Sequence, residues 1–119
     1  MISLKQLRTT TYDSDLQRIS IGGGILNGAV YAALQKIDRS ITHGRCPTVG
    51  AGGYLLGGGV GFDMRCHGIA CDKLISTEIV LANGEIVTAN ANVNPDLFWA
   101  CRGGIRSRES GGLTVFEAM

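Results

Sequence analysis

Glycine is concentrated in one segment of this chain. Between Gly44 and Gly61, eight of eighteen residues are glycine, and the stretch from Cys46 to Phe62 carries no charge. Glycine loses more conformational freedom on folding than other residues, so this density is expected where the backbone adopts positive φ or approaches another group closely. Bare backbone amides suit a phosphate or a flat ring. The segment therefore predicts a ligand site lined by backbone, without naming the ligand.

The common nucleotide-binding fingerprints do not fit this segment. A Gly-x-Gly-x-x-Gly pattern starting at Gly50 requires glycine at position 55, where Leu55 stands, and one starting at Gly59 fails at Met64. No Gly-Lys-Ser/Thr follows the glycines, which excludes a Walker A phosphate loop. The predicted site is a different arrangement of backbone amides.

The cysteines and histidines form no recognised metal-binding pattern. The four cysteines stand at positions 46, 66, 71 and 101, with no Cys-x-x-Cys pair. His43 and His67 supply no zinc spacing. We expect no metal site, and we expect free thiols that are buried or partly buried at positions 66, 71 and 101.

Composition indicates a small globular domain. Apolar residues make up 45% of the 119 residues and charged residues 18%, which is typical of a folded chain with a modest core. The net charge is +1 and no basic block is present, so nucleic acid is not an expected partner. The first residues lack the apolar region of a signal peptide, and no uncharged stretch reaches the ~20 residues of a membrane helix. The default expectation is a cytoplasmic protein without a membrane segment.

Local patterns predict strands and helices around the glycine segment. Residues 4–11 and 16–22 favour a hairpin with its turn at 12–15, and residues 26–37 carry apolar positions at helical spacing. Asn83-Gly84 predicts a second hairpin, between strands 74–82 and 85–91, with both faces covered. Asn94 followed by Pro95 predicts the N-cap and start of a short buried helix, and Gly103-Gly104 its end. The last fifteen residues show no clear period.

Four motifs follow one another along the chain. They are Gly-Arg-Cys-Pro-Thr-Val-Gly-Ala-Gly-Gly with Leu-Gly-Gly-Gly-Val-Gly (44–53 and 56–61), His-Gly-Ile-Ala-Cys-Asp (67–72), the hairpin 78–89, and Asn-Pro-Asp-Leu-Phe-Trp-Ala-Cys-Arg-Gly-Gly (94–104). Together they resemble the FAD-linked oxidases of the berberine-bridge-enzyme type, within the p-cresol methylhydroxylase and vanillyl-alcohol oxidase group. The resemblance is in order over residues 1–104, while 105–119 stays uncertain. It implies a partial FAD-binding domain over 1–119, of α+β class, with a mixed or antiparallel sheet, flanking helices and both ends incomplete.

The resemblance also implies which residues contact FAD. By residue-to-residue matching, the cofactor-binding positions are Cys46, Thr48, Val49, Gly50, Gly52, Gly53, Gly57, Gly58, Gly59 and Gly61. At the position of Cys46 many relatives carry a cysteine bonded to the flavin through sulfur, and others carry a different residue. Covalent attachment and noncovalent contact are therefore both open, and Arg45 is positioned in sequence to favour the thiolate.

The implied function is that of an FAD-dependent oxidoreductase, which moves a hydride from a small organic substrate to flavin and electrons to oxygen. In the family, an upstream phosphate loop with a flavin-linking histidine precedes the matched region, and a substrate domain with the catalytic groups follows it. We therefore expect weak FAD binding and no catalytic residues in this chain, and the alternative is a non-catalytic remnant. Two further departures are Tyr54, where many relatives have histidine, and residues 105–110.

Overall fold

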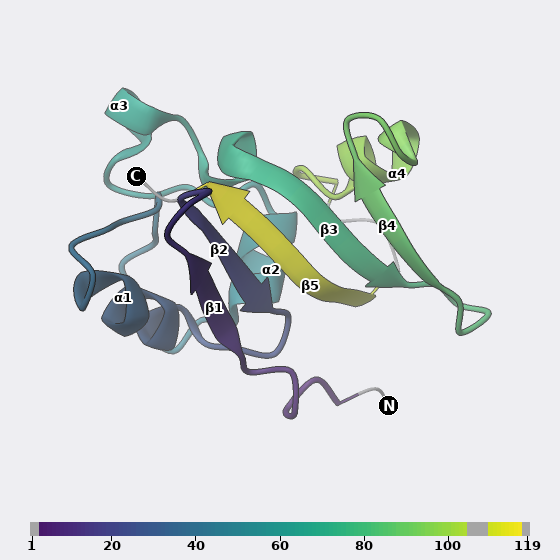
Figure 1. The fold of residues 1–119 in the computed structure, drawn as a ribbon, viewed down its shortest axis with the longest axis horizontal. Coiled ribbons are helices and arrows are strands. Elements are labelled where there is room, and N and C mark those ends of the chain that lie inside the picture. Colours follow the sequence, from purple (N-terminus) through teal and green to yellow (C-terminus); the bar gives the residue numbers. More distant parts are fainter. Residues whose placement is uncertain (1–2, 105–109, 118–119) are drawn as a thin grey trace.

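A five-stranded antiparallel sheet forms the centre of the molecule (Figure 1). The computed structural model describes residues 3–104 and 110–117. The strand order is β1-β2-β5-β3-β4, and every neighbouring pair is antiparallel. The strands are β1 (Thr10–Asp13), β2 (Arg18–Gly22), β3 (Leu74–Val80), β4 (Ile86–Asn90) and β5 (Ser110–Glu117). The predicted α+β class with an antiparallel sheet is confirmed.

Short helices flank the sheet. They are α1 (Asn27–Gln35), α2 (Ala51–Leu56), α3 (Met64–His67), the 3-10 helix η1 (Ala70–Lys73) and α4 (Pro95–Ala100). Figure 1 shows α2 behind β2 and β5, with α1 at one end of the molecule and α4 beside β4 at the other. The glycine segment supplies α2 and the turns on either side of it, between α1 and α3.

One hydrophobic core joins the sheet to the helices. Ile19 and Ile21 of β2 are 1% exposed, as is Val30 of α1. Alternate residues of a strand point to the same face, so these two isoleucines lie against one layer of helices. Most of the other members come from α1, α2, η1, β3, β4 and α4, and they include Leu34, Ala51, Leu55, Ala70, Ile79, Ala89 and Phe98. The core therefore fixes α2 and η1, which carry the candidate site.

Several local predictions require correction. The first strand covers only Thr10–Asp13, and its turn falls at residues 14–17 because the Asp13 carboxylate accepts the amides of Asp15 and Leu16. The outer face of the second hairpin is open, since Val80 is 37% exposed and Ile86 is 64% exposed. A four-residue helix, α3, follows the glycine segment, where the local patterns above predict no element.

The short helix α4 also differs from its prediction. Asn94 has φ 49° and does not cap the helix with its side chain, whose amide instead donates to the Thr88 carbonyl at 2.8 Å. The helix is only half buried, because Phe98 is 7% exposed while Trp99 is 76% exposed. The helix is thus joined to β4 through Asn94 and to the core through Phe98.

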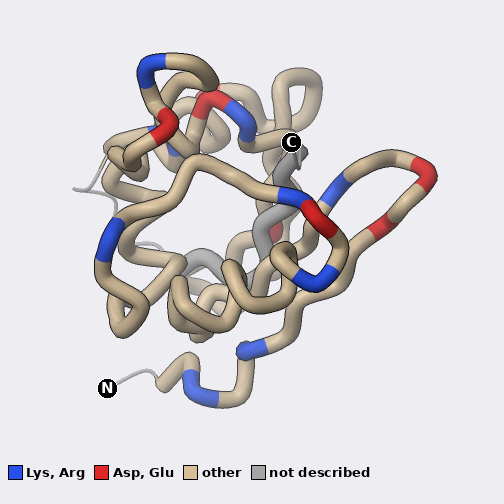
Figure 2. Tube along the Cα trace, turned by 90° about the vertical axis from the view of Figure 1, so that its left-hand side faces the viewer, with Lys and Arg blue, Asp and Glu red and all other residues tan. Residues whose placement is uncertain are grey.

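Charged side chains are spread over the described surface. Figure 2 shows basic and acidic positions interspersed along the trace, without a continuous run of one sign. Within the described residues, no helix is long and apolar enough to cross a membrane, and no group of three potential metal ligands comes together.

Candidate functional site

Backbone hydrogen bonds hold the loop that begins the glycine segment against the start of α1. The amide of Asn27 donates to the Val49 carbonyl at 2.9 Å, and the amide of Gly28 donates to the Pro47 carbonyl at 2.9 Å. A Cβ on Gly28 would lie 2.7 Å from the Cβ of Pro47, so only glycine permits this approach. These contacts fix the backbone on both sides of Thr48 and leave the outer edge of the loop exposed.

Cys46 stands exposed on this loop with a polarised thiol. Its Sγ atom lies 3.2 Å from the Thr48 hydroxyl oxygen. The pKa of the Cys46 thiol is lowered, first by that hydroxyl and then by the backbone amides of Thr48 and Val49. Hydrogen bonds to a thiolate favour the charged form, which is the nucleophilic form of cysteine.

Arg45 does not have the role that the sequence suggested for it. Its guanidinium carbon lies 5.5 Å from the centre of the Phe62 ring, in a cation–π arrangement. The groups that lower the pKa of the Cys46 thiol are those of Thr48 and Val49, and Arg45 is not among them. The activation of this thiol therefore comes from its own loop and not from the neighbouring charge.

Two glycines after Cys46 present open backbone to solvent. Among the described residues, and apart from the chain neighbours and the backbone of α2 itself, no atom lies within 4 Å of a Cβ added at Gly50 or at Gly53. Within the described residues, the amides of Gly50 and Gly53 donate to no protein acceptor. Thr48 and Val49 are also exposed, whereas Ala51 is buried and Gly52 is half-buried. We call the exposed residues, 46–50 and 53, the open edge.

Other glycines of the segment have reasons within the protein itself. A Cβ on Gly52 would lie 2.7 Å from the Gly23 carbonyl oxygen, and one on Gly61 would lie 2.4 Å from the His43 carbonyl oxygen. Gly58 and Gly59 are buried with φ of 96° and 75°, which side chains rarely adopt. The exposed Gly57 ends α2, and its amide donates to the Gly53 carbonyl at 3.2 Å. For these positions the contact with FAD stays a prediction.

The positive-φ turn at Gly58 and Gly59 rests on η1. The amides of Ala70 and Cys71 donate to the carbonyls of Gly59 and Gly58 at 2.9 and 3.0 Å. Cys71 in turn accepts a 3.0 Å hydrogen bond at its carbonyl from the Nε of Arg102. A residue near the end of α4 thus supports the turn through one intermediate element.

Two residues that support this arrangement, Tyr54 and Arg102, were not predicted from the sequence to be part of the site. The Tyr54 hydroxyl donates to the Val60 carbonyl at 3.1 Å, and burial raises the pKa of Tyr54 to about 12. Its ring lies 3.0 Å from the Cβ position of Gly59 and 3.2 Å from that of Gly44, so Tyr54 joins the two ends of the segment. Arg102 is the second, and only its place in the Arg-Gly-Gly motif signals it.

Relatives of this chain are FAD-linked enzymes. The family described as the FAD binding domain matches residues 1–90. A xylooligosaccharide oxidase of Thermothelomyces thermophilus is 40% identical over 104 residues, which cover 87% of this chain and 21% of the relative. A glucooligosaccharide oxidase of Sarocladium strictum is 43% identical over 107 residues, with the same coverage. The chain thus spans about a fifth of these curated relatives.

Solved structures agree with the sequence relatives. A xylooligosaccharide oxidase from Myceliophthora thermophila C1, in complex with xylobiose, superposes with a TM-score of 0.93 at 37% identity, over 99% of this chain and 25% of that one. A glucooligosaccharide oxidase from Acremonium strictum gives 0.92 at 36% identity, over 100% and 25%. The fold is that of the p-cresol methylhydroxylase type, and the chain belongs to the FAD-binding-domain family of the FAD-linked oxidoreductases.

Proposed function

We propose that the open edge is the part of this chain that contacts FAD. The observation that carries the proposal is the pair Gly50 and Gly53, which leave room for a ligand beside an activated thiol. A glycine required by the protein's own packing is pressed against protein atoms, as Gly52 is. A glycine with open space on its Cα instead permits a ligand to approach the backbone.

The residues of the open edge have separate roles in this proposal. The free amides of Gly50 and Gly53 donate hydrogen bonds to the cofactor, and Thr48 and Val49 form the wall beside it. Gly57, Gly58, Gly59 and Gly61 shape the turn behind α2, and Gly52 brings α2 close to residue 23. When bound, FAD supplies the hydride and electron chemistry, and the protein supplies placement and electrostatics.

We also propose that Cys46 is the attachment point for the flavin. One solved relative, the glucooligosaccharide oxidase, is described as carrying a 6-S-cysteinyl, 8α-N1-histidyl FAD. In this chain the thiol of Cys46 is exposed and its pKa is lowered by Thr48. Overall, the S–H and one ring C–H are replaced by a C–S bond, and dioxygen takes the two hydrogens as hydrogen peroxide.

The reaction class follows from the family. We propose that the protein to which this fold belongs transfers a hydride from an alcohol, amine or sugar-like carbon to flavin and passes the electrons to oxygen. Xylooligosaccharide and glucooligosaccharide oxidases among the relatives support a substrate with oxidisable C–O bonds. No residue of 3–104 is assigned as a proton-transfer group.

Two experiments test these proposals. Titrating FAD into the chain and following flavin fluorescence should show quenching that Gly53→Leu removes and Ala32→Leu leaves unchanged. Ala32 is an exposed helix position on α1, so it controls for the added side chain. Equal quenching by both variants would place FAD elsewhere.

The second experiment concerns the linkage. After aerobic incubation with FAD, tryptic digestion and mass spectrometry should find a flavin-sized adduct on the Cys46 peptide. It should be absent from Cys46→Ser and from the peptide of Cys66, which is also exposed rather than buried or partly buried as its sequence suggested. A Cys46 peptide found only as free thiol, in a sample that quenches flavin fluorescence, would reject the linkage and keep the binding.

A further inference from the structure

A hollow lies beside the open edge, between the loop before Cys46 and the segment that enters α3. Its volume is about 330 Å³, and it is lined by Gly44, Arg45, Val60, Gly61, Phe62, Met64 and Arg65. Its two sides meet backbone to backbone, because a Cβ on Gly61 would lie 2.4 Å from the His43 carbonyl oxygen. The hollow is thus held by packing that only glycine permits.

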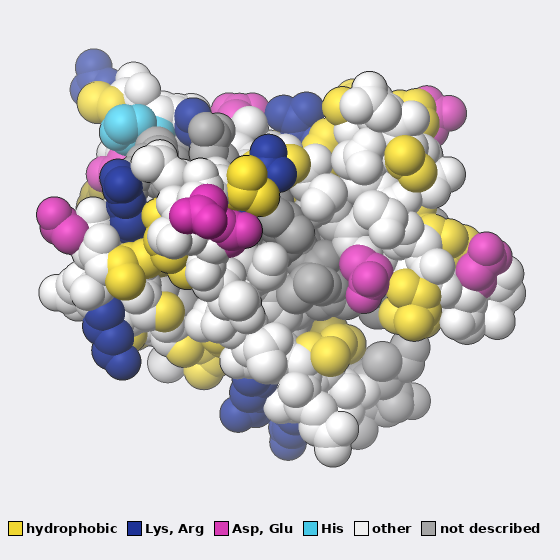
Figure 3. All heavy atoms as spheres, viewed as in Figure 1, with side chains coloured by type: hydrophobic (Ala, Val, Ile, Leu, Met, Phe, Trp, Pro, Cys, Tyr) yellow, Lys and Arg dark blue, Asp and Glu magenta, His cyan; other side chains and the backbone are white. Residues whose placement is uncertain are grey.

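The walls of the hollow are apolar and unusually exposed. Val60 is 62% exposed, Phe62 is 63% exposed and Met64 is 42% exposed. Figure 3 shows apolar and basic side chains next to each other over α3. Three large apolar side chains around one concave surface favour a ligand with an apolar body.

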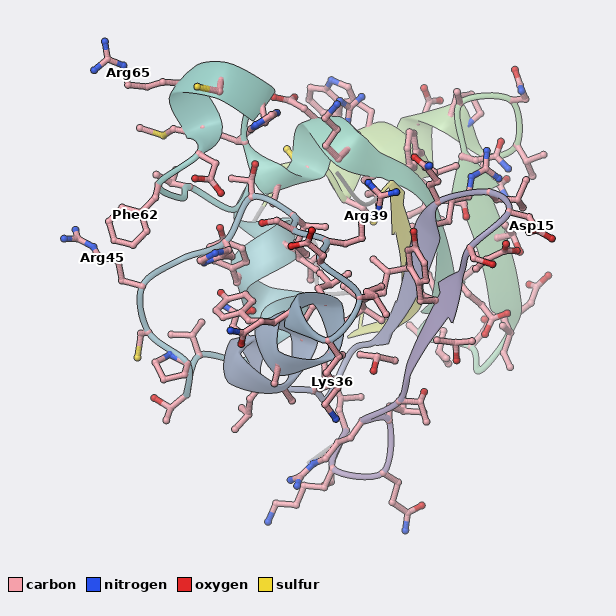
Figure 4. All side chains as sticks on the ribbon, turned by 60° about the vertical axis from the view of Figure 1, so that its left-hand side comes forward. Asp15, Lys36, Arg39, Arg45, Phe62 and Arg65 are labelled. Atoms are coloured by element: carbon pink, nitrogen blue, oxygen red, sulfur yellow. The ribbon has the colours of Figure 1, made fainter. Side chains whose placement is uncertain are left out.

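Two guanidinium groups border the same hollow. Figure 4 shows Arg45, Phe62 and Arg65 projecting from the same side of the molecule, with the phenyl ring between the two arginines. The Arg45 guanidinium lies over the Phe62 ring, 5.5 Å from its centre. Within residues 3–104, neither Arg45 nor Arg65 forms an ion pair with a carboxylate. Guanidinium groups match carboxylates in both charge and planar hydrogen-bonding geometry.

From this combination we propose that the hollow is a substrate subsite for a small molecule with an apolar body and a carboxylate. Arg45 lines the hollow and immediately precedes Cys46 in the sequence, so the proposal puts the substrate next to the residue proposed to hold the flavin. This inference rests on the proposed function and deepens it. It states that the hollow binds an anionic, partly apolar substrate in preference to a neutral oligosaccharide.

The test compares two probes that share the same apolar body and differ in their polar end, which is a carboxylate in one and a neutral hydroxyl in the other. 4-Phenylbutyrate and 4-phenylbutanol are titrated into the ¹⁵N-labelled chain without FAD, and the amide shifts of Gly61 and Phe62 are followed. We expect the carboxylate to bind at least tenfold more tightly than the alcohol at low salt. The double variant Arg45→Gln, Arg65→Gln should remove that difference, whereas Arg39→Gln, which alters an arginine outside this hollow, should preserve it.

The outcomes separate this inference from the proposed function. Three results would overturn the inference: equal affinities for the two probes, no amide shift with either probe, or tighter binding of xylobiose titrated in the same way. Each would do so even if FAD still shifts the amides of Gly50 and Gly53. Binding of 4-phenylbutyrate by a chain in which FAD perturbs neither glycine would overturn the role as a substrate subsite. Selective carboxylate binding together with FAD binding would support it.

Discussion

The Nε of Arg102 donates a 3.0 Å hydrogen bond to the carbonyl of Cys71, which joins residues 31 positions apart. The Cys71 thiol points back to the Arg102 carbonyl oxygen at 3.7 Å, so each residue contacts the other's backbone. Through the amides of η1, this contact reaches the carbonyls of Gly58 and Gly59. The turn after α2 is therefore supported by a residue that follows α4.

Replacing Arg102 should loosen that support. Arg102→Ala removes the bond to Cys71, the 3.6 Å ion pair with Asp72 and the cation–π contact with Phe98. We expect the free energy of unfolding to fall by about 1–2 kcal/mol, the range for a hydrogen bond from a charged donor that is partly exposed. Amide hydrogen exchange at Ala70 and Cys71 should accelerate.

The Asp72 side of this contact provides the control. Asp72 and Arg102 are half and about one-third exposed, so their ion pair alone contributes little. Asp72→Asn retains an oxygen that accepts the Ile69 amide, and it should change stability by less than about 0.5 kcal/mol. If Asp72→Asn costs as much as Arg102→Ala, the ion pair and not the backbone hydrogen bond carries the support.

The reactivity of Cys46 should depend on Thr48. Because the Thr48 hydroxyl is the main group lowering the pKa of the Cys46 thiol, Thr48→Val should raise that pKa and reduce the thiolate fraction near neutral pH. Iodoacetamide should then alkylate Cys46 several-fold more slowly at pH 7, and the difference should vanish once the pH is high enough to ionise the thiol in both proteins. The Cys66 peptide serves as the internal reference, and an unchanged Cys46 rate would contradict the assignment.

Alanine substitutions at Gly52 and Gly53 should change the stability of the protein in opposite directions. Gly53→Ala places a methyl group in open space within α2, and it should raise stability by about 0.5–1 kcal/mol through helix propensity. Gly52→Ala places one 2.7 Å from the Gly23 carbonyl oxygen and should lower stability by about 1–3 kcal/mol. Urea denaturation measures both, and a destabilised Gly53→Ala protein would show that position 53 is not open.

The hydroxyl of Tyr54 should ionise at a higher pH than that of an ordinary tyrosine. Burial disfavours the tyrosinate, so its pKa lies at about 12. The tyrosinate absorbance of the wild type and of Tyr54→Phe is followed as the pH is raised. The difference between the two curves should be the titration of one group with a midpoint near pH 12. Because the folded pKa is raised, the stabilisation is complete below the unfolded value of about 10 and is lost as pH rises toward 12. A difference curve centred near pH 10 would contradict the packing of this ring.

Local sequence signals were sufficient for the elements that form from nearby residues. The helical spacing of residues 26–37 corresponds to α1, and Asn83-Gly84 lies in the turn between β3 and β4, where Gly84 has φ 85°. Positive φ at a turn is a property of the residues themselves, so the sequence reveals it. Trp99, in contrast, was expected in the core, and its exposure depends on what the rest of the fold leaves uncovered.

Long-range pairing was beyond the sequence patterns. β5 lies between β2 and β3, yet its residues show no clear period, and they pair with residues 30 to 99 positions earlier. The glycines illustrate the same limit within the site. Gly50, Gly52 and Gly53 are alike in sequence, but only the approach of residue 23 distinguishes Gly52 from the two open positions.

The central claim is that FAD contacts the open edge, and a ¹H–¹⁵N titration of the chain with FAD tests it most directly. With FAD raised to about 1 mM, enough to detect binding near 0.1 mM, the amides of Gly50 and Gly53 should shift most. Gly84, in the distant β3–β4 turn, should not move. Shifts confined to other regions, or no shifts at the highest FAD concentration, would contradict the account.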